Sequence, residues 1–546
     1  MAGHFQRGSW LGAALLGLAA TGSGACAADR ADALATKTPI KHLVVIFQEN
    51  VSFDHYFATY PQATNPQGEP AFTALPNTPG LPGQGAIDTL ASAGLLTNNP
   101  NKTNPKNGAD AADPFRLDIT QAATADQNHL YTAEQAAADN LAMDLFPHFT
   151  GVAGKGGVGA FNTKGLVMGY YDGNTVTALW NYAQHFAMSD NSFGTTFGPS
   201  TPGALNLVSG QTNGAVLPPD AAIDADGTYA RNAIAPDGAG GWTDIGDLDP
   251  TGDVCSKGKT ALMAGKNIGD LLNEANIGWG FFEGGFDLGA TNADGSTGCA
   301  RATRSDITTV KYADYIPHHQ PFQYYASTAN PQHKRPSSVA TIGTSDDGGA
   351  NHQYDMSDFA AALRSGDFPA VSFLKAPAFQ DGHAGYSDPL DEQTFLVETI
   401  NALQQSPEWA TTAVVILWDD SDGWYDHAVK IVNPSAVNGY DVLNGDHCGT
   451  GAPLPGVTGQ PAQGRCAYGA RQPLLVVSPY ARANVVDHTL TDQTSVLRFI
   501  EDNWLQGRRI GQGSFDALAG SLDGMFDWSN GANPKLTLDA KTGEAM

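Results

Sequence analysis

Residues 41–50 read KHLVVIFQEN, and this stretch decides the class of fold. Positions 43–47 form a continuous apolar run rich in β-branched side chains, which predicts a strand buried on both faces of a parallel sheet. A second run of this kind, VVILW, occupies positions 414–418. Strand-like and helical patterns also alternate elsewhere: strands at 277–282, 368–375 and 474–478, and helices at 261–274, 395–404 and 492–504. This alternation predicts an α/β fold with a mainly parallel central sheet and helices on both faces.

Both apolar runs end in oxygen-bearing side chains. Glu49 and Asn50 follow the first run, and Asp419 and Asp420 follow the second. Ligands of open α/β sheets collect at the carboxyl ends of the strands, so these side chains are expected to hold a cation. Oxygen ligands suit Ca²⁺, Mg²⁺ or Mn²⁺, and Zn²⁺ becomes an option where imidazole is added. The simpler alternative for either pair alone is a loop start or a helix cap.

The composition limits the classes of partner. The chain has 546 residues, enough for one large α/β domain with insertions or for two domains. Its formal net charge of -27 repels nucleic acid and anionic lipid, so neither is an expected partner. The simplest explanation of this charge is solubility outside the cell.

The N-terminal residues have the pattern of an export signal. Arg7 precedes an apolar stretch at 10–20, and positions 25–27 (ACA) fit a small-x-small cleavage site. A membrane anchor is the alternative, but this stretch is too short to span a bilayer. We therefore expect a signal peptide at 1–27, a linker at 28–40, no stable membrane insertion, and export to the periplasm or the extracellular space.

The cysteines suggest disulfides. Cleavage after residue 27 removes Cys26 and leaves Cys255, Cys299, Cys448 and Cys466. An even number in an exported protein suggests two bridges, and four cysteines allow three pairings. Pairing of nearest neighbours, Cys255 with Cys299 and Cys448 with Cys466, is the expectation.

Long polar stretches rich in glycine, proline and asparagine separate the predicted elements. Loops of this length are uncommon unless they are functional or contain small elements of their own, so we interpret them as insertions that shape the rim of a pocket. The stretches are 61–113, 213–253, 285–309 and 433–469. The catalytic domain is expected to span 41–510, and 511–546 to form a C-terminal tail.

A candidate nucleophile lies in the segment FGTTFGPSTPGALNLVSG at 193–210. Gly198-Pro199-Ser200 predicts a tight loop, and Pro202 stands where a helix can begin. Ser200 would then lie at a helix N-terminus, where free N–H groups and the helix dipole favour an oxyanion or a phosphate. The alternative is that Ser200 is only the N-cap of that helix.

Four histidines in loops are further candidates: His318 and His319 in a segment bounded by prolines, His383 in DGHAGY, and His129 before a leucine. Imidazole can ligate a metal, donate to phosphate oxygens or protonate a leaving group near neutral pH. A loop histidine can also be merely exposed.

Three motifs together resemble a known family. The segment ENVSFDHYF at 49–57 is similar to the ENRSFDHYFG signature of the bacterial phosphoesterases that include respiratory-burst-inhibiting acid phosphatases and non-zinc phospholipases C, with Val51 in place of arginine. WDDSDGWYDH at 418–427 resembles the second acidic motif of that family, and GPS at 198–200 resembles its nucleophile loop. The resemblance covers about 41–504 and implies an alkaline-phosphatase-like α/β sandwich.

The resemblance also implies a mechanism. One divalent metal ion, with Ca, Zn, Mg, Mn and Fe all open, would be surrounded by Glu49, Asn50, Ser200, Asp419 and Asp420. Ser200 would attack phosphorus and form a phosphoserine. The histidines would contact phosphate oxygens or protonate the leaving group; these are His318, His319, His383 and, as the weaker candidate, His129. Asp426 and His427 would support the ligands.

Within the family, two departures favour the acid phosphatase branch. The phospholipase branch typically carries threonine in the nucleophile loop, where this chain has Ser200, and the pair His318-His319 looks like the phosphatase branch. The expected function is a secreted, metal-dependent acid phosphatase acting on small phosphate esters. A phospholipase C acting on phosphodiesters is the first alternative, and an exported, non-catalytic binding protein is the second.

Overall fold

The computed structural model describes residues 31–223, 229–230, 232–236, 240–430, 467–532 and 534–546. The predicted signal peptide and the predicted pairing of Cys448 with Cys466 lie outside these residues. No helix in the described ranges is both long enough and apolar enough to cross a membrane.

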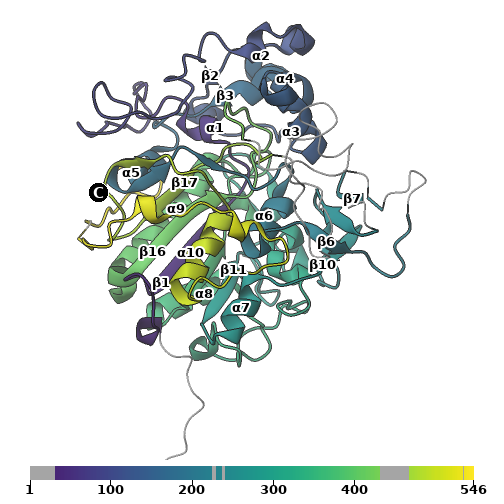
Figure 1. Ribbon diagram of the computed structural model, residues 1–546. Coiled ribbons are helices and arrows are strands. Elements are labelled where there is room, and N and C mark those ends of the chain that lie inside the picture. The colour runs from purple at the N-terminus through teal and green to yellow at the C-terminus, as the bar shows by residue number, and fades with distance from the viewer. Residues whose placement is uncertain (1–30, 224–228, 231, 237–239, 431–466, 533) are drawn as a thin grey trace, which may run out of the picture.

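A large sheet forms the centre of the molecule (Figure 1). All neighbouring strands pair in parallel except β17, which is antiparallel to both of its neighbours. In spatial order the strands are β14 (Gln353–Asp355), β11 (Trp279–Glu283), β15 (Val371–Lys375), β1 (His42–Gln48), β16 (Thr412–Trp418), β17 (Leu474–Val477), β4 (Ala187–Ser189) and β18 (Val485–Asp487). The predicted α/β fold with a mainly parallel sheet is confirmed.

Helices pack around this sheet in two groups. The helices are α1 (Phe53–Phe57), α2 (Pro100–Thr103), α3 (Tyr131–Ala138), α4 (Phe146–Phe149), α5 (Thr177–His185), α6 (Ser200–Ser209), α7 (Ile268–Glu274), α8 (Met356–Ser365), α9 (Pro389–Gln405) and α10 (Thr494–Trp504). Helix α6 contacts α7 and α10, whereas α5 contacts α9 and the strands β4 and β17. Figure 1 shows α10 in front of the sheet and the segment with α2, α3 and α4 above one end of it.

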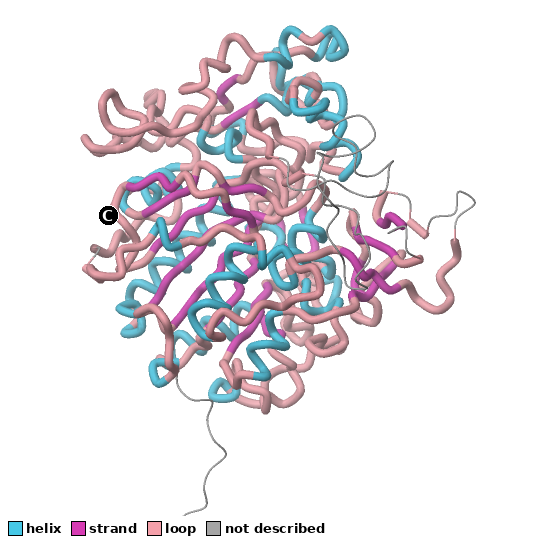
Figure 2. Tube along the Cα trace, viewed as in Figure 1, coloured by secondary structure: helices cyan, strands magenta, loops and turns pink. Residues whose placement is uncertain are grey.

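The insertions carry small elements of their own, within much loop (Figure 2). A five-stranded sheet has the order β7 (Ile234–Pro236), β8 (Trp242–Asp244), β6 (Asn213–Val216), β10 (Thr260–Met263) and β9 (Asp249–Pro250). The described residues also form three two-stranded sheets: β12 (Ala302–Arg304) with β13 (Lys311–Ala313), β19 (Thr491–Asp492) with β5 (Ser192–Phe193), and β2 (Phe115–Arg116) with β3 (Gly169–Tyr170). The predicted disulfide between Cys255 and Cys299 is confirmed.

One predicted helix is partly wrong. The segment 261–274 was expected to be helical throughout, but its first residues belong to the strand β10, which pairs with β6. The helix α7 begins only after Asn267, whose side chain accepts a hydrogen bond from Asp270 N–H in a capping box. The apolar spacing is compatible with a helix, but the cap at Asn267 and pairing with a neighbouring strand decide where it begins.

The register of the two central strands positions the ends of both apolar runs. Strand β1 pairs in parallel with β16 along its whole length, and Gln48 lies opposite Trp418. Both strands are completely buried. The residues that follow them, Glu49 and Asp419, therefore leave the sheet side by side at its carboxyl edge.

Residues on both flanks of the predicted catalytic domain pack against it. Thr38 N–H donates to Asn503 Oδ1 at 2.9 Å, which ties the N-terminal flank to α10. Leu536 N–H donates to Gln404 Oε1 at 2.7 Å, which ties the C-terminal tail to α9.

Candidate active site

The two motifs at the sheet edge are hydrogen-bonded to each other. Asn50 N–H donates to Asp419 Oδ1 at 3.0 Å, and Val51 N–H donates to the Asp420 carbonyl oxygen at 3.0 Å. Asn50 has a φ of 64°, a left-handed conformation that asparagine tolerates better than most residues. This turn brings Glu49, Asn50, Asp419 and Asp420 together as predicted.

Ser200 joins these side chains from the start of α6. Its Oγ lies 2.9 Å from Glu49 Oε2 and 3.3 Å from Asp420 Oδ2, and the residue is 2 % exposed. The N-cap of α6 is Pro199, so the alternative that Ser200 serves as the N-cap is wrong. The hydroxyl instead faces carboxylates, with the positive end of a ten-residue helix behind it.

A close approach of backbones holds α6 against the second motif. A Cβ atom added to Gly203 would lie 2.1 Å from the carbonyl oxygen of Asp419. Only glycine leaves room for this contact, which brings the first turn of α6 down onto the residues after β16. The spacing between Ser200 and Asp420 depends on this contact.

The oxygen atoms at this edge fit a divalent cation. Asn50 Oδ1 and Asp419 Oδ2 are buried and have no hydrogen-bond partner among the described residues. Burial and the charge of Asp419 raise the pKa of both Glu49 and Asp420 well above its usual range. Carboxylates that are crowded and buried in this way gain stability from a cation, and the donor set consists entirely of oxygen. Glu49, Asn50, Asp419 and Asp420, with Ser200, are the residues that would hold it.

The pair His318-His319 reaches the site from the short helix Pro317–His319. His319 Nδ1 lies 3.2 Å from Glu49 Oε1, and burial together with the charge of Lys375 lowers the pKa of this histidine well below its usual range. His318 lies one step further out, with Nδ1 3.3 Å from Asp249 Oδ1. Burial alone would lower the pKa of His318, but nearby aspartates raise it.

His129 and His383 form a second pair of histidines. Their ring centroids are 5.8 Å apart, and each Nδ1 lies within hydrogen-bond distance of a backbone carbonyl, which leaves Nε2 for other partners. His129 Nδ1 also lies 3.0 Å from Asp422 Oδ1. Burial alone would lower the pKa of His129, but Asp420 and Asp422 raise it well above its usual range, whereas burial lowers the pKa of His383.

Lys375 also lies at this site, and it was not among the residues predicted from the sequence. Its ammonium forms an ion pair with Glu49 Oε1 and lies 3.6 Å from Asp419 Oδ2, and its side chain is 1 % exposed. The sequence did contain a signal, because Lys375 is the last residue of a predicted strand. Glu49 and Asp419 each follow directly after the last residue of a strand. A polar residue at the carboxyl end of a buried parallel strand deserves the same interpretation in all three cases.

Two aspartates at the site were also missed. Asp422 Oδ1 accepts from Asn50 Nδ2 at 3.3 Å and thereby connects the ligand candidates to His129. The backbone carbonyl of Asp381 accepts from Glu49 N–H at 2.9 Å, and its carboxylate lies in a cluster with Glu49 and His319 that has the geometry to hold a cation. Asp422 belongs to the run DDSDG, so its sequence position was a usable signal.

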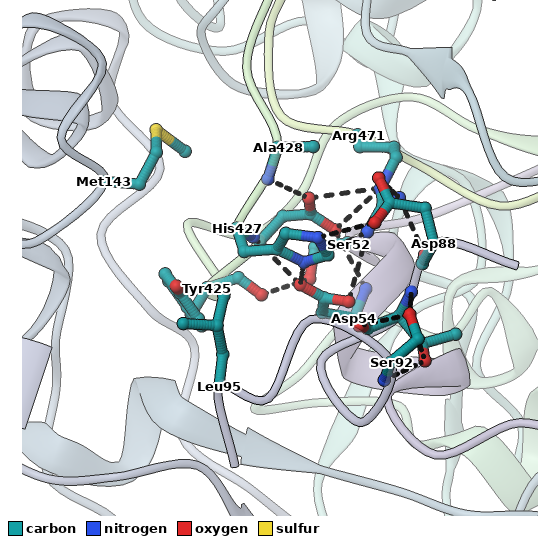
Figure 3. A network of polar contacts seen from close by, with 12 residues as sticks. Ser52, Asp54, Asp88, Ser92, Leu95, Met143, Tyr425, His427, Ala428 and Arg471 are labelled. Carbon is teal, nitrogen blue, oxygen red and sulfur yellow. Dashed lines mark hydrogen bonds and ion pairs between the residues drawn. The ribbon is translucent and has the colours of Figure 1, made fainter. Parts of the chain in front are cut away.

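A buried arginine, Arg471, joins the segment after β1 to the segment after β16, and Figure 3 shows it beside Asp54 and His427. Arg471 Nη2 lies 3.1 Å from Asp54 Oδ1, and Arg471 Nε lies 3.2 Å from Asp426 Oδ1. Asp54 N–H donates to Asp426 Oδ2 at 3.0 Å, and His427 N–H donates to Asp54 Oδ2 at 2.9 Å. The guanidinium pairs with both carboxylates, and Asp426 and His427 belong to this network of ion pairs and hydrogen bonds.

A family model matches most of the chain. The model described as "Phosphoesterase family" matches residues 40–505, which includes every candidate ligand and histidine named above.

Curated relatives extend the comparison. "Phospholipase C B" of Mycobacterium tuberculosis is 24 % identical over 515 residues, which cover 92 % of this chain and 80 % of the relative. "Non-hemolytic phospholipase C" of Burkholderia pseudomallei is 23 % identical and covers 91 % of this chain and 60 % of the relative. A protein of the same name from Pseudomonas aeruginosa is 30 % identical over a shorter stretch, 30 % of this chain and 24 % of the relative. With the family match across most of its length, this chain belongs to the phosphoesterase family and is a hydrolase that acts on phosphate esters.

Proposed function

We propose that this protein is a metal-dependent acid phosphatase that hydrolyses phosphomonoesters through a phosphoserine at Ser200. The observation that carries the proposal is the position of the Ser200 hydroxyl, which lies 2.9 Å from Glu49 Oε2 and 3.3 Å from Asp420 Oδ2 at the start of α6. A buried serine surrounded by carboxylates and a helix N-terminus is arranged for deprotonation and for binding an anion.

A divalent cation bound by Glu49, Asn50, Asp419 and Asp420 would lower the pKa of the Ser200 hydroxyl and offset negative charge on the transferring phosphoryl group. The residues of the chain supply the remaining functions. Ser200 Oγ is the attacking atom, and the N-terminal N–H groups of α6 can hold a phosphate oxygen. Water then releases phosphate from the phosphoserine.

The four histidines divide by charge. Nearby carboxylates raise the pKa of His129 and His318, so these two rings suit proton donation to a leaving oxygen. Burial lowers the pKa of His319 and His383, so these two remain neutral and suit hydrogen bonding to phosphate oxygens. Because the pKa of His129 and His318 is raised, these rings stay protonated to higher pH than an ordinary histidine, so they can donate a proton in mild acid and above it.

The second candidate function is a phospholipase C, and the printed names of the relatives favour it. A choline phosphodiester would use the same nucleophile and metal ligands and differ only in its leaving group. The third alternative, a non-catalytic binding protein, is not favoured, because the family match points to an enzyme.

We also propose export to the periplasm or beyond. The apolar segment at 10–20 and the disulfide between Cys255 and Cys299 support this location, because disulfides persist in oxidising compartments. Cell fractionation followed by N-terminal sequencing tests it. A mature protein in the cytoplasm that still begins at residue 1 would contradict the proposal.

The nucleophile is tested with Ser200→Ala and Ser200→Thr. The alanine variant is expected to lose about 10³-fold or more in turnover, the scale seen when a covalent nucleophile is removed, whereas threonine keeps a hydroxyl and part of the activity. Intact mass after an acid quench should show one added phosphoryl group on the wild type and none on Ser200→Ala. Full activity of the alanine variant would overturn the assignment.

The substrate class is tested with p-nitrophenyl phosphate and p-nitrophenylphosphorylcholine side by side, each with and without chelator. Faster release from the monoester, abolished by chelator and restored by a divalent ion, is the expected result. Faster release from the choline diester would move the protein to the phospholipase side.

A further inference from the structure

We propose that Lys375 is a positioning residue of the metal site: its fixed positive charge orients Glu49 and Asp419 and matches the site to a single divalent ion. This inference rests on the proposed function, because it assumes that these carboxylates bind a metal.

The two carboxylate oxygens of Glu49 have different partners, and Lys375 contacts only one of them. Glu49 Oε1 is held by the Lys375 ammonium and lies 3.2 Å from His319 Nδ1. Glu49 Oε2 is left for Ser200, whose hydroxyl lies 2.9 Å away. With one oxygen fixed, the other cannot rotate away from the nucleophile, so Lys375 sets which carboxylate oxygen faces the reacting group.

The fold explains why a lysine reaches this position. Strand β1 lies between β15 and β16, and both neighbours run parallel to it, with Ile46 opposite Leu374 on one side and Gln48 opposite Trp418 on the other. Lys375 ends β15 and Asp419 follows β16. The Lys375 ammonium and Asp419 therefore lie on opposite sides of Glu49, which follows the central strand β1. Lys375 Nζ lies over the Phe47 ring, 4.9 Å from the ring centroid.

The formal charges of Lys375 and of the three proposed carboxylate ligands, counted without the neighbouring Asp381, Asp422 and His129, match a single divalent ion. Glu49, Asp419 and Asp420 contribute three negative charges, and Lys375 contributes one positive charge. All four side chains are buried, so solvent screens these charges little. The remaining charge of two is neutralised by one divalent cation. Removal of the lysine leaves three charges unmatched, which should attract the cation more strongly.

Loss of the Lys375 charge should have opposite effects on metal binding and on turnover. In Lys375→Met, which keeps a long unbranched stem, the Kd for Mn²⁺ should fall by about tenfold because a repelling charge has been removed. Turnover should fall by about tenfold or more because Glu49 is no longer fixed against Ser200. A lysine that merely stabilises the fold would weaken metal binding and activity together.

The experiment is isothermal titration of chelator-treated protein with Mn²⁺, combined with melting curves and kcat at saturating metal. Lys375→Arg keeps the charge but not the geometry and should show a Kd near that of the wild type with a reduced kcat. Lys41→Met is the matched control, since Lys41 lies before the opposite end of β1 and its Nζ donates to the Leu34 carbonyl at 2.5 Å. This control should change neither quantity.

Each outcome decides the question. Tighter Mn²⁺ binding and a larger rise of melting temperature with metal in Lys375→Met support the proposal. Weaker binding in that variant overturns it. If Lys375→Met folds only when Mn²⁺ is present, the proposal is supported, and if it fails to fold at saturating Mn²⁺, the proposal is overturned. The titration does not depend on turnover, so failure of the proposed function shows separately, in the Ser200 variants.

Discussion

At the scale of single residues, the site depends on one glycine as much as on its charged groups. Gly203→Ala would place a methyl group against the Asp419 carbonyl, which a Cβ would approach to 2.1 Å, so α6 must shift away from the second motif. We expect a loss of about 1–3 kcal/mol in unfolding free energy from overpacking and a much larger proportional loss of activity.

Urea unfolding and turnover of purified Gly203→Ala measure both effects. Gly278→Ala is the control, because a Cβ there would have only the Gly343 carbonyl nearby, at 3.4 Å. Unchanged activity in Gly203→Ala would mean that the spacing of Ser200 from Asp420 does not matter.

Sequence reasoning found the residues whose position follows from a strand end. Glu49 and Asp419 could be placed because a parallel strand delivers its next residue to a known edge of the sheet. The contact between Asp422 and His129 could not be predicted, because it depends on how a distant loop folds over the sheet. The charge state of each histidine was equally inaccessible, since burial and neighbouring aspartates decide it.

At the scale of elements, the buried side chain of Arg471 connects the segments that carry the proposed metal ligands. Arg471 lies just before β17 and pairs with Asp54 at the start of α1 and with Asp426 after β16. Arg471→Met would remove the guanidinium that balances the charge of two buried carboxylates, and breaking a buried ion pair in this way typically costs roughly 3–5 kcal/mol of unfolding free energy. We expect this variant to be strongly destabilised. It should also bind metal more weakly, because the segments after β1 and β16, which carry the proposed ligands, are no longer connected through Arg471.

Chemical unfolding and Mn²⁺ titration of Arg471→Met are the measurements. The triple variant Arg471→Met/Asp54→Asn/Asp426→Asn removes the charges as a group, and it should recover part of the lost stability because no buried carboxylate is left unpaired. A single variant as stable as the wild type would show that the network does not hold the motifs.

Element types were predicted better than element boundaries. Long apolar runs identified β1 and β16 because burial on both faces permits little else. The error at 261–274 arose because its apolar spacing suits a helix, while pairing with β6 makes its first part a strand. Strand pairing between segments distant in sequence leaves no local signal of this kind.

At the scale of the whole molecule, two histidines give stability opposite dependences on pH. Burial lowers the pKa of His55 to about 3, so the folded protein keeps this ring neutral, stacked 3.9 Å from the Trp424 ring. The contribution of His55 to the free energy of unfolding is fully present above the unfolded pKa of about 6.5, and it is lost as pH falls towards 3. His427 behaves in the opposite way: although burial disfavours its charged form, Asp54 and Asp88 raise its pKa to about 10. Its contribution is present below pH 6.5 and is lost as pH rises towards 10.

The alkaline side is tested with His427→Gln. The stability difference between wild type and variant should be largest near pH 6 and should shrink steadily up to pH 10, because only the wild type loses a proton that pairs with Asp54 and Asp88. Urea unfolding at pH 6, 8 and 9.5 measures this difference. A gap that does not change with pH would mean that His427 is neutral in the folded protein.

The acidic side matters more for an enzyme proposed to work in mild acid. Replacing His55 by phenylalanine keeps an aromatic ring against Trp424 but removes the hydrogen bond to the Gly169 carbonyl, so the variant should be less stable than the wild type at pH 7. Between pH 7 and 4.5 the unfolding free energy of the wild type should fall by roughly 2–3 kcal/mol, because its imidazole takes up a proton in the unfolded state but stays neutral in the folded state. The phenylalanine variant has no such loss. The gap in urea unfolding should therefore close, and the variant should become the more stable protein if the hydrogen bond contributes less than that amount. A gap that widens on acidification would show that His55 is protonated in the folded state, against the burial that the structure gives it.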